Sequence, residues 1–174
     1  DTIENIGYMD WCGLENIKIG DSIKSIGSFN ECSNLKSLYI GKQTKIENVN
    51  AAFEGCKNLV DITVSEENPY YKAVDNCLYT KDEKTLIVAG KNIKGTVRIK
   101  EGVERISGGC FSYCKQIDKI IIPDSVVDIG PQAFSDCVNL KDITAGNNIS
   151  EIGANVVINT PYYEKQSNWS EGIL

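Results

Sequence analysis

The chain has 174 residues, of which 41% are hydrophobic, and it carries a formal net charge of −6 with a pI near 4.8. This length and apolar content are sufficient for a single domain with a sizeable core. The acidic balance argues against nucleic acid and anionic membranes as partners, because both attract a basic face. The chain has no histidine, which excludes Ser-His-Asp and Cys-His catalytic sites and histidine-ligated metal sites.

The sequence begins at Asp1, without a starting methionine or a charged-then-apolar leader. It also has no apolar run of about 18 residues that could span a bilayer. Residues 3–7 already follow the repeat pattern described below. We therefore expect the chain to be a fragment of a longer protein that continues beyond Leu174.

A short pattern recurs along the chain, in which a phenylalanine is followed at fixed spacing by a cysteine and then by a leucine or isoleucine. Its copies are Met9-x-x-Cys12 (a weaker one), Phe29-x-x-Cys32-x-x-Leu35, Phe53-x-x-Cys56-x-x-Leu59, Phe111-x-x-Cys114-x-x-Ile117 and Phe134-x-x-Cys137-x-x-Leu140. The cysteines are separated by 20, 24, 58 and 23 residues, so the third interval is one unit plus an insertion of 35 residues. Such a period predicts a stacked solenoid with one interruption.

Each copy is followed by a run in which apolar and polar residues alternate, as in residues 35–40. This alternation predicts a strand with one buried and one exposed face. Polar residues such as Tyr39 and Asp61 are expected to share one sheet surface, and extended sheet surfaces are what solenoids use for binding.

From about residue 64 to 94 the period fails, and the sequence predicts a polar loop followed by a β-hairpin. Cys77–Thr80 and Thr85–Val88 are β-rich runs joined by a charged turn. Such an insertion can carry function, or it can brace the solenoid. The sequence favours the two hypotheses equally.

The repeats resume at Gly95. We predict one solenoid over residues 1–174, with repeats at about 3–63 and 95–158 and the β-hairpin insertion at about 64–94. Residues 159–174 resemble the first half of a second, truncated hairpin insertion.

The most regular unit carries Ile122-Pro123-Asp124-Ser125-Val126, Ile129-Gly130, Ala133-Phe134, Cys137 and Leu140, and it resembles the BspA-like, or treponemal-type, leucine-rich repeat. The resemblance covers residues 3–62 and 95–158, although segment 26–29 is two residues short and segment 46–53 is two residues long. It implies an α/β solenoid, a right-handed coil with a parallel β-sheet on the concave face, short helical turns on the convex face and a β-hairpin insertion. It also implies a secreted or cell-surface protein that acts in adhesion.

The chain has seven cysteines, five of which share one repeat position and none of which forms a C-x-x-C pair. This spacing favours a buried column over a zinc or redox site. Cys110 takes another core position, and Cys77 lies in the insertion. Whether any cysteines pair stays open at this point, because neighbours in the column could approach disulfide distance.

The sequence contains no motif for catalysis, a cofactor or a metal. Glu66-Glu67 and Asp82-Glu83 are neighbouring carboxylates, but both pairs lie in segments expected to be exposed loop or turn. No phosphate-binding loop and no calcium loop is present. We therefore expect a protein that is not an enzyme and that needs neither cofactor nor metal.

The missing motifs predict a noncatalytic protein-interaction module without membrane insertion in this chain, and the resemblance implies that it belongs to a secreted or cell-surface protein. The expected partner is a protein ligand, such as a host matrix or cell-surface protein, with a glycan as the alternative. The candidate partner-binding residues are Lys36, Tyr39, Asp61, Thr63, Asp118, Lys119, Asp142 and Thr144.

Two further hypotheses stay open. The chain could be a structural spacer or targeting region of a larger surface enzyme. It could also be a carbohydrate-binding module that uses exposed aromatic residues of the insertions, including Trp169. For Tyr70, Tyr71 and Tyr79 we instead expect packing of the hairpin against the solenoid.

Overall fold

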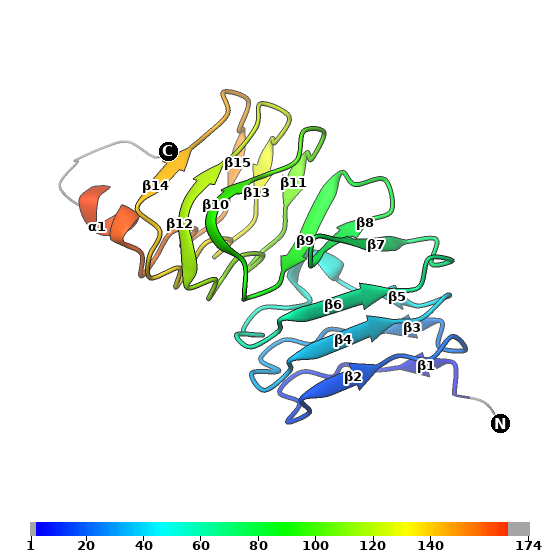
Figure 1. The fold of residues 1–174 in the computed structure, drawn as a ribbon. Helices are drawn as coiled ribbons and strands as arrows, with labels where there is room; N and C mark the ends of the chain where they lie inside the picture. The colour runs from blue at the N-terminus through cyan, green and yellow to red at the C-terminus, as the bar shows by residue number, and fades with distance from the viewer. Residues whose placement is uncertain (1–2, 167–174) are drawn as a thin grey trace.

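The computed structural model describes residues 3–166 and shows a solenoid whose regular turns each supply one longer strand and one strand of two residues (Figure 1). In the first block, residues 3–64, the longer strands are β2 (Asn16–Lys18), β4 (Ser37–Ile40) and β6 (Asp61–Val64). The short strands are β1 (Asn5–Ile6), β3 (Ser25–Ile26) and β5 (Lys45–Ile46). Each set forms a parallel sheet, and we call these the long-strand and the short-strand sheet.

The second block, residues 94–158, repeats this arrangement. Its long-strand sheet contains β10 (Lys94–Arg98), β12 (Gln116–Ile121) and β14 (Asp142–Thr144). Its short strands are β11 (Arg105–Ile106), β13 (Asp128–Ile129) and β15 (Glu151–Ile152). The two blocks stack along different directions, and the chain turns between them at the insertion (Figure 1).

The insertion contains the predicted hairpin. Strands β8 (Cys77–Thr80) and β9 (Thr85–Ala89) pair in antiparallel fashion, which confirms the two β-rich runs. The structure adds a third strand, β7 (Tyr71–Val74), which pairs with β8. Strand β9 also pairs in parallel with β11, so the insertion continues the short-strand sheet of the second block.

Almost none of the expected helical turns is found among the described residues, so the α/β and helical-turn expectations are not confirmed. Within residues 3–166 the helices are the 3₁₀ helix η1 (Val49–Ala51) and helix α1 (Pro161–Gln166). The residue before every column cysteine has a positive φ, and a left-handed residue ends a helical run. These residues are Trp11, Glu31, Gly55, Tyr113 and Asp136.

Helix α1 lies where the sequence predicts the start of a second hairpin. Pro161 is its first residue, a position where the missing N–H would have no intrahelical partner. The helix is anchored to the last repeat by the Tyr162 N–H, which donates to the Leu140 carbonyl at 3.0 Å. The rest of that predicted first half, which includes Gly172–Leu174, lies outside the described residues.

Columns of identical residue types form the core. The rings of Phe29 and Phe53 stack with centroids 5.4 Å apart, and those of Phe111 and Phe134 lie 5.7 Å apart. All four rings are buried. They belong to two hydrophobic clusters, one in each block.

The hairpin separates the two clusters and contributes to both. Leu78 of β8 belongs to the cluster of the first block, whereas Cys77 and Tyr79 on either side of it belong to that of the second. Alternate residues of a strand point to opposite faces, so β8 is buried on both sides. The adjacent apolar run 86–89 in β9 is likewise shared between the clusters. The insertion therefore lies between the two cores and contributes side chains to both.

Three polar side chains of the insertion close the end of the first block. The Tyr71 hydroxyl accepts from the Ile46 N–H at 3.0 Å and donates to the Ile46 carbonyl at 3.2 Å. Asn76 accepts from the Ile62 N–H at 3.0 Å and donates to the Val60 carbonyl. Asn68 donates to two carbonyls of the loop before β5 and is buried. These groups replace the backbone partners that a next regular turn would supply.

The cysteine column also has a hydrogen-bonding role. Cys56 donates its S–H to the Phe29 carbonyl at 3.0 Å, and Cys137 donates to the Phe111 carbonyl at 3.1 Å. Each thiol thus satisfies a carbonyl of the preceding turn, and both are buried. The placement of these residues in a buried column is confirmed, but they are more than small apolar fillers.

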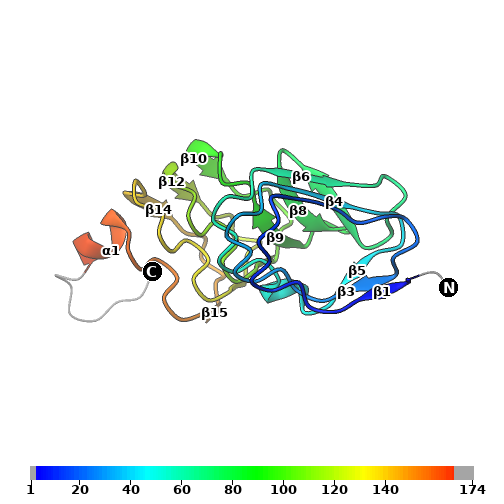
Figure 2. The ribbon, with the colours of Figure 1, turned by 90° about the horizontal axis from the view of Figure 1, so that it is seen from below.

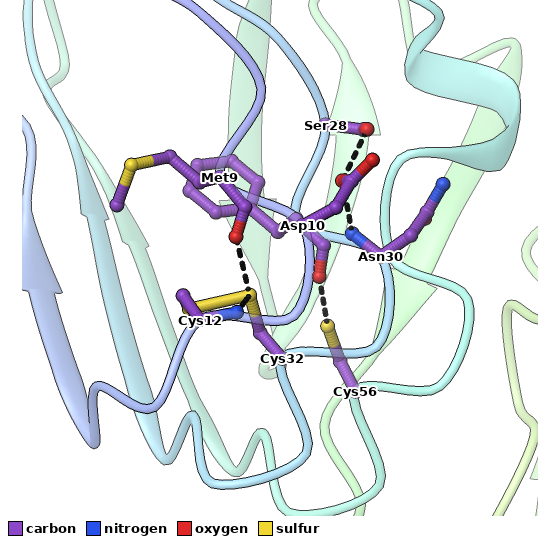
Figure 3. The surroundings of a disulfide bond; sticks show 8 residues. Met9, Asp10, Cys12, Ser28, Asn30, Cys32 and Cys56 are labelled. Atoms are coloured by element: carbon purple, nitrogen blue, oxygen red, sulfur yellow. Dashed lines mark hydrogen bonds between the residues drawn. A yellow bond between two sulfur atoms is a disulfide. The ribbon is translucent and has the colours of Figure 1, made fainter.

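At the N-terminal end of the column, Cys12 and Cys32 form a disulfide with their Cα atoms 4.8 Å apart (Figure 3). Cys32 Sγ also lies 2.9 Å from the Met9 carbonyl, the position that matches the thiol contacts of later turns. A disulfide sulfur carries no proton, so Cys32 does not donate to this carbonyl as the thiols of later turns do, and the covalent bond instead ties the first two turns together. The other five cysteines are free and buried.

Replacing Tyr71 by Phe should lower the free energy of unfolding by about 1–3 kcal/mol, because it leaves both backbone groups of Ile46 without this partner. Urea denaturation followed by circular dichroism measures the change. Tyr70→Phe is the matched control, since Tyr70 is 41% exposed and its hydroxyl makes no such bond. Equal effects of the two changes would contradict the capping role.

Alkaline pH should destabilise the protein through its buried thiols. Burial raises the pKa of Cys56, Cys77 and Cys137 to about 12, against an ordinary value of about 8.5. Below a pH of about 8.5 both the folded and the unfolded chain keep these protons. The contribution of the protonated thiols to the free energy of unfolding is therefore fully present there. As the pH rises from there toward 12, the unfolded chain alone releases protons and the free energy of unfolding falls.

Each such thiol contributes a slope of up to about 1.4 kcal/mol per pH unit. Urea denaturation at several pH values between about 9 and 10.5, under argon, measures the slope. Cys137→Ala should reduce this slope by the contribution of one thiol, up to about 1.4 kcal/mol per pH unit, whatever the effect of the substitution on stability at neutral pH. Identical slopes for the two proteins would refute the buried-thiol explanation.

Candidate binding surfaces

The long-strand sheet of the first block exposes two rows of side chains. The first row runs across the strands through Asn16, Ser37 and Asp61, which are register partners. The second row runs through Lys18, Tyr39 and Thr63. The two rows line a shallow pocket of about 240 Å³.

Contacts within these rows hold most of the side chains in place. Ser37 donates to Asn16 Oδ1 at 2.7 Å, and Lys18 Nζ lies 5.5 Å from the centroid of the Tyr39 ring. Thr63 is oriented toward the Leu38 carbonyl at 3.5 Å. Among the described residues, Asp61 has no hydrogen-bond or ion-pair partner for its carboxylate. The surface therefore combines an ordered aromatic ring with one unpaired negative charge.

Three of the four candidate residues in this block lie in these rows, and Lys36 does not. Lys36 precedes the first residue of β4 and forms an ion pair with Glu15 at 2.9 Å. The repeat pattern placed it one position too far into the strand. Asn16 and Lys18 were not selected from the sequence, although their alternation around Ile17 is the same signal as in β4.

The second long-strand sheet carries the other four candidates. Lys119 and Asp142 are register partners and form an ion pair at 2.6 Å. Thr144 lies beside Ile121 in the next row. Asp118 lies at an irregularity of the register between β10 and β12, where Thr96 donates to it at 3.4 Å.

The same sheet exposes Arg98 of β10, a residue that sequence reasoning missed. It is the register partner of Ile121 and is exposed. The alternation in residues 96–98 could have identified it, but the interruption just before β10 obscures the period there.

The two groups of candidates do not form one sheet. Strand β6 ends the first long-strand sheet and β10 begins the second, without pairing between them. The three-stranded insertion lies between the blocks (Figure 1). The chain therefore offers two separate sheet faces rather than one continuous surface.

The neighbouring carboxylates do not resemble an acid/base pair. Hydrogen bonding by Thr80 and by the Lys84 N–H lowers the pKa of Asp82. Hydrogen bonds from Lys100 and Lys72 lower the pKa of Glu83. Proton transfer near neutral pH needs a pKa raised toward 7, which is the opposite direction. Glu67 is engaged in an ion pair with Lys42 at 2.8 Å.

The described part of the chain has neither a metal-ion cluster nor a membrane-spanning helix. In this part, no group of three or more histidine, cysteine, aspartate or glutamate residues could hold a metal ion. Within the same residues, no helix has both the length and the apolar character required to cross a bilayer.

The aromatic residues of the insertion mostly pack inward. Tyr71 is 3% exposed and Tyr79 is 8% exposed, which confirms the packing expected for both. Tyr70 is more exposed, and Lys45 Nζ lies 5.8 Å from the centroid of its ring. Trp169 lies outside the described residues. Tyr71 and Tyr79 therefore offer no platform on which a sugar could stack.

Comparison with known families gives a match over almost the whole chain. The family described as "BspA type leucine rich repeat region (6 copies)" matches residues 1–95 and 89–167. A search of curated proteins found no match.

Solved structures with a similar fold include three bacterial proteins, all below 25% identity, so the likeness concerns the fold alone. The pneumococcal vaccine antigen PcpA has a TM-score of 0.69 at 18% identity, over 91% of this chain and 52% of that one. A leucine-rich repeat protein from Eubacterium ventriosum has a TM-score of 0.57 at 17% identity, over 90% and 61%. A leucine-rich cell surface protein from Faecalibacterium prausnitzii has a TM-score of 0.51 at 20% identity, over 90% and 68%. The chain thus spans about half of the antigen.

Proposed function

The chain belongs to the BspA-type leucine-rich-repeat family, and from that premise we propose that it is a noncatalytic protein-interaction module of a secreted or cell-surface protein, with a role in adhesion to host or neighbouring-cell macromolecules. Two of the structural relatives are a vaccine antigen and a cell surface protein, which supports a surface location. The module binds a protein ligand through its sheet faces.

The observation that carries this proposal is the exposed face of the first long-strand sheet. Its side chains stand on a rigid parallel sheet, and the Tyr39 ring is already ordered by Lys18. Ordered aromatic side chains lose little conformational entropy on binding and are frequent anchors of protein interfaces. Repeat solenoids present such faces without rearrangement.

The Tyr39 ring next to the unpaired Asp61 carboxylate favours the first face as the principal contact. On the second face, Lys119 and Asp142 already neutralise each other. On the first face the Asp61 carboxylate is exposed and lacks a partner among the described residues. A ligand with a basic or N–H-rich group would pair with the Asp61 carboxylate and at the same time pack against the Tyr39 ring.

The experiment measures binding of this chain to a panel of host extracellular-matrix proteins, host cells and glycans. Tyr39→Ala and Asp61→Ala should each weaken saturable binding to one protein ligand by about tenfold or more, as expected for residues at the centre of an interface. Lys36→Ala is the control, because Lys36 lies outside the two rows, and it should have little effect. Surface plasmon resonance provides the affinities, and circular dichroism verifies that each variant is folded.

Two outcomes would count against this proposal. If the folded chain binds no member of the panel, a spacer or targeting role would be favoured. Binding that both sheet-face variants retain would place the contact elsewhere on the molecule.

A further inference from the structure

A cleft of about 690 Å³ lies beside the interruption. It is lined by Ser25, Lys45, Ile46, Glu47, Asn48, Val49, Asn50, Ala51 and Tyr71. These residues come from the short-strand sheet, from η1 and from β7. Figure 2 shows the short-strand sheet on the side of the block opposite the long-strand sheet, so the cleft is distinct from the two rows described above.

The cleft arises where two departures from the repeat meet. Segment 46–53 is two residues longer than in the most regular unit, and it contains the three-residue helix η1. Directly after this unit the insertion replaces the next regular turn, and Tyr71 of the insertion closes one end of the cleft. A turn of regular length followed by another regular turn would leave no such space.

The backbone of this segment is fixed by both blocks. The Glu47 N–H donates to the Ile26 carbonyl at 2.8 Å, and the Asn50 carbonyl accepts from the Gly108 N–H of the second block at 2.9 Å. A β-carbon at Gly108 would lie 3.3 Å from the Pro131 carbonyl oxygen and 3.4 Å from the Asn50 carbonyl oxygen, so glycine relieves crowding between these backbones. The backbone of the segment is therefore held in a defined position between the two blocks.

The polar side chains of the segment contribute nothing to the fold that the structure shows. Within residues 3–166, no hydrogen bond or ion pair is made by the side chains of Glu47, Asn48 or Asn50. All three are exposed, whereas Val49 and Ala51 between them are half-buried and present apolar surface. A few polar groups on a fixed backbone beside an apolar patch are a usual composition of a small-molecule site, and the volume lies in the usual range.

The chemistry of the lining selects the kind of ligand. Lys45 supplies one positive charge and Glu47 one negative charge, which disfavours a strongly charged ligand such as a phosphate ester. The two asparagine amides each both donate and accept hydrogen bonds, and a carboxylate accepts them. Sugar hydroxyl groups likewise donate and accept, while the C–H face of a sugar ring is apolar.

We propose that this cleft binds a neutral oligosaccharide of about two or three sugar units, with Glu47, Asn48 and Asn50 bonded to its hydroxyl groups and Val49 and Ala51 beneath a ring face. The proposal does not depend on the sheet faces or on a protein ligand. It also differs from sugar stacking on the aromatic residues of the insertion, since Tyr71 only forms an end wall.

The test is an NMR titration of the ¹⁵N-labelled chain with maltotriose and, separately, with N,N′,N″-triacetylchitotriose. At least one probe should bind saturably and shift the amide signals of residues 45–51 more than those of residues 37–39 and 61–63. Glu47→Ala and Asn50→Ala should each weaken that binding by about tenfold, because each removes a hydrogen-bonding group from a fixed position.

The matched controls are Glu101→Ala and Asn34→Ala, which remove the same groups from exposed positions outside the cleft. They should leave the affinity unchanged, and their circular dichroism spectra should match those of the cleft variants. The proposal is overturned if neither probe saturates, if the shifts centre on the sheet rows, or if cleft and control variants bind equally. Absence of a protein ligand in the panel above would not affect this result.

Discussion

The structure depends on the need to pair every strand edge with the next turn. A parallel strand of two to four residues has too few contacts to be stable alone, and its free N–H and C=O groups must find partners when they are buried. In both blocks the next turn supplies them, as in the pairing of β4 with β6. At the interruption no such turn follows β5 and β6. There, side chains of the insertion take over, and Tyr71 and Asn76 each satisfy one donor and one acceptor.

The same constraint explains why the insertion is apolar on both faces. A hairpin on the flank of a solenoid would bury one face and leave the other in water. This one lies between two cores, so its strands contribute Leu78 to one cluster and Tyr79 to the other. Strand β9 then becomes the first edge on which the second block is built, through its pairing with β11. The interruption therefore ends the first block, and its strand β9 provides the edge with which the second block pairs. This allows the stacking direction to change.

The sequence was sufficient for the features that repeat. The spacing of the phenylalanines and cysteines predicted the buried columns, and the runs 77–80 and 85–88 predicted the hairpin. Features set by backbone dihedrals were not predictable from residue type, because Trp11, Glu31 and Tyr113 adopt a positive φ that these residues seldom favour. The pairing of Cys12 with Cys32 also required coordinates, since five equivalent cysteines share the column. At the candidate site, alternation identified Tyr39 and Asp61 but misplaced Lys36, which lies just outside the strand.

A uniform repeat array offers the same surface at every turn, so recognition of a particular ligand must come from residues that differ between turns. On the long-strand sheets these are the outward positions, where Tyr39 in the first block corresponds to Ile121 or Thr144 in the second. On the short-strand side the difference lies in the backbone, because one unit is longer and the next is replaced by the hairpin. Both kinds of difference fall next to the interruption, in the last turns of the first block. Stability comes from what the turns share, whereas the binding specificity proposed above would come from the place where the repeat is broken.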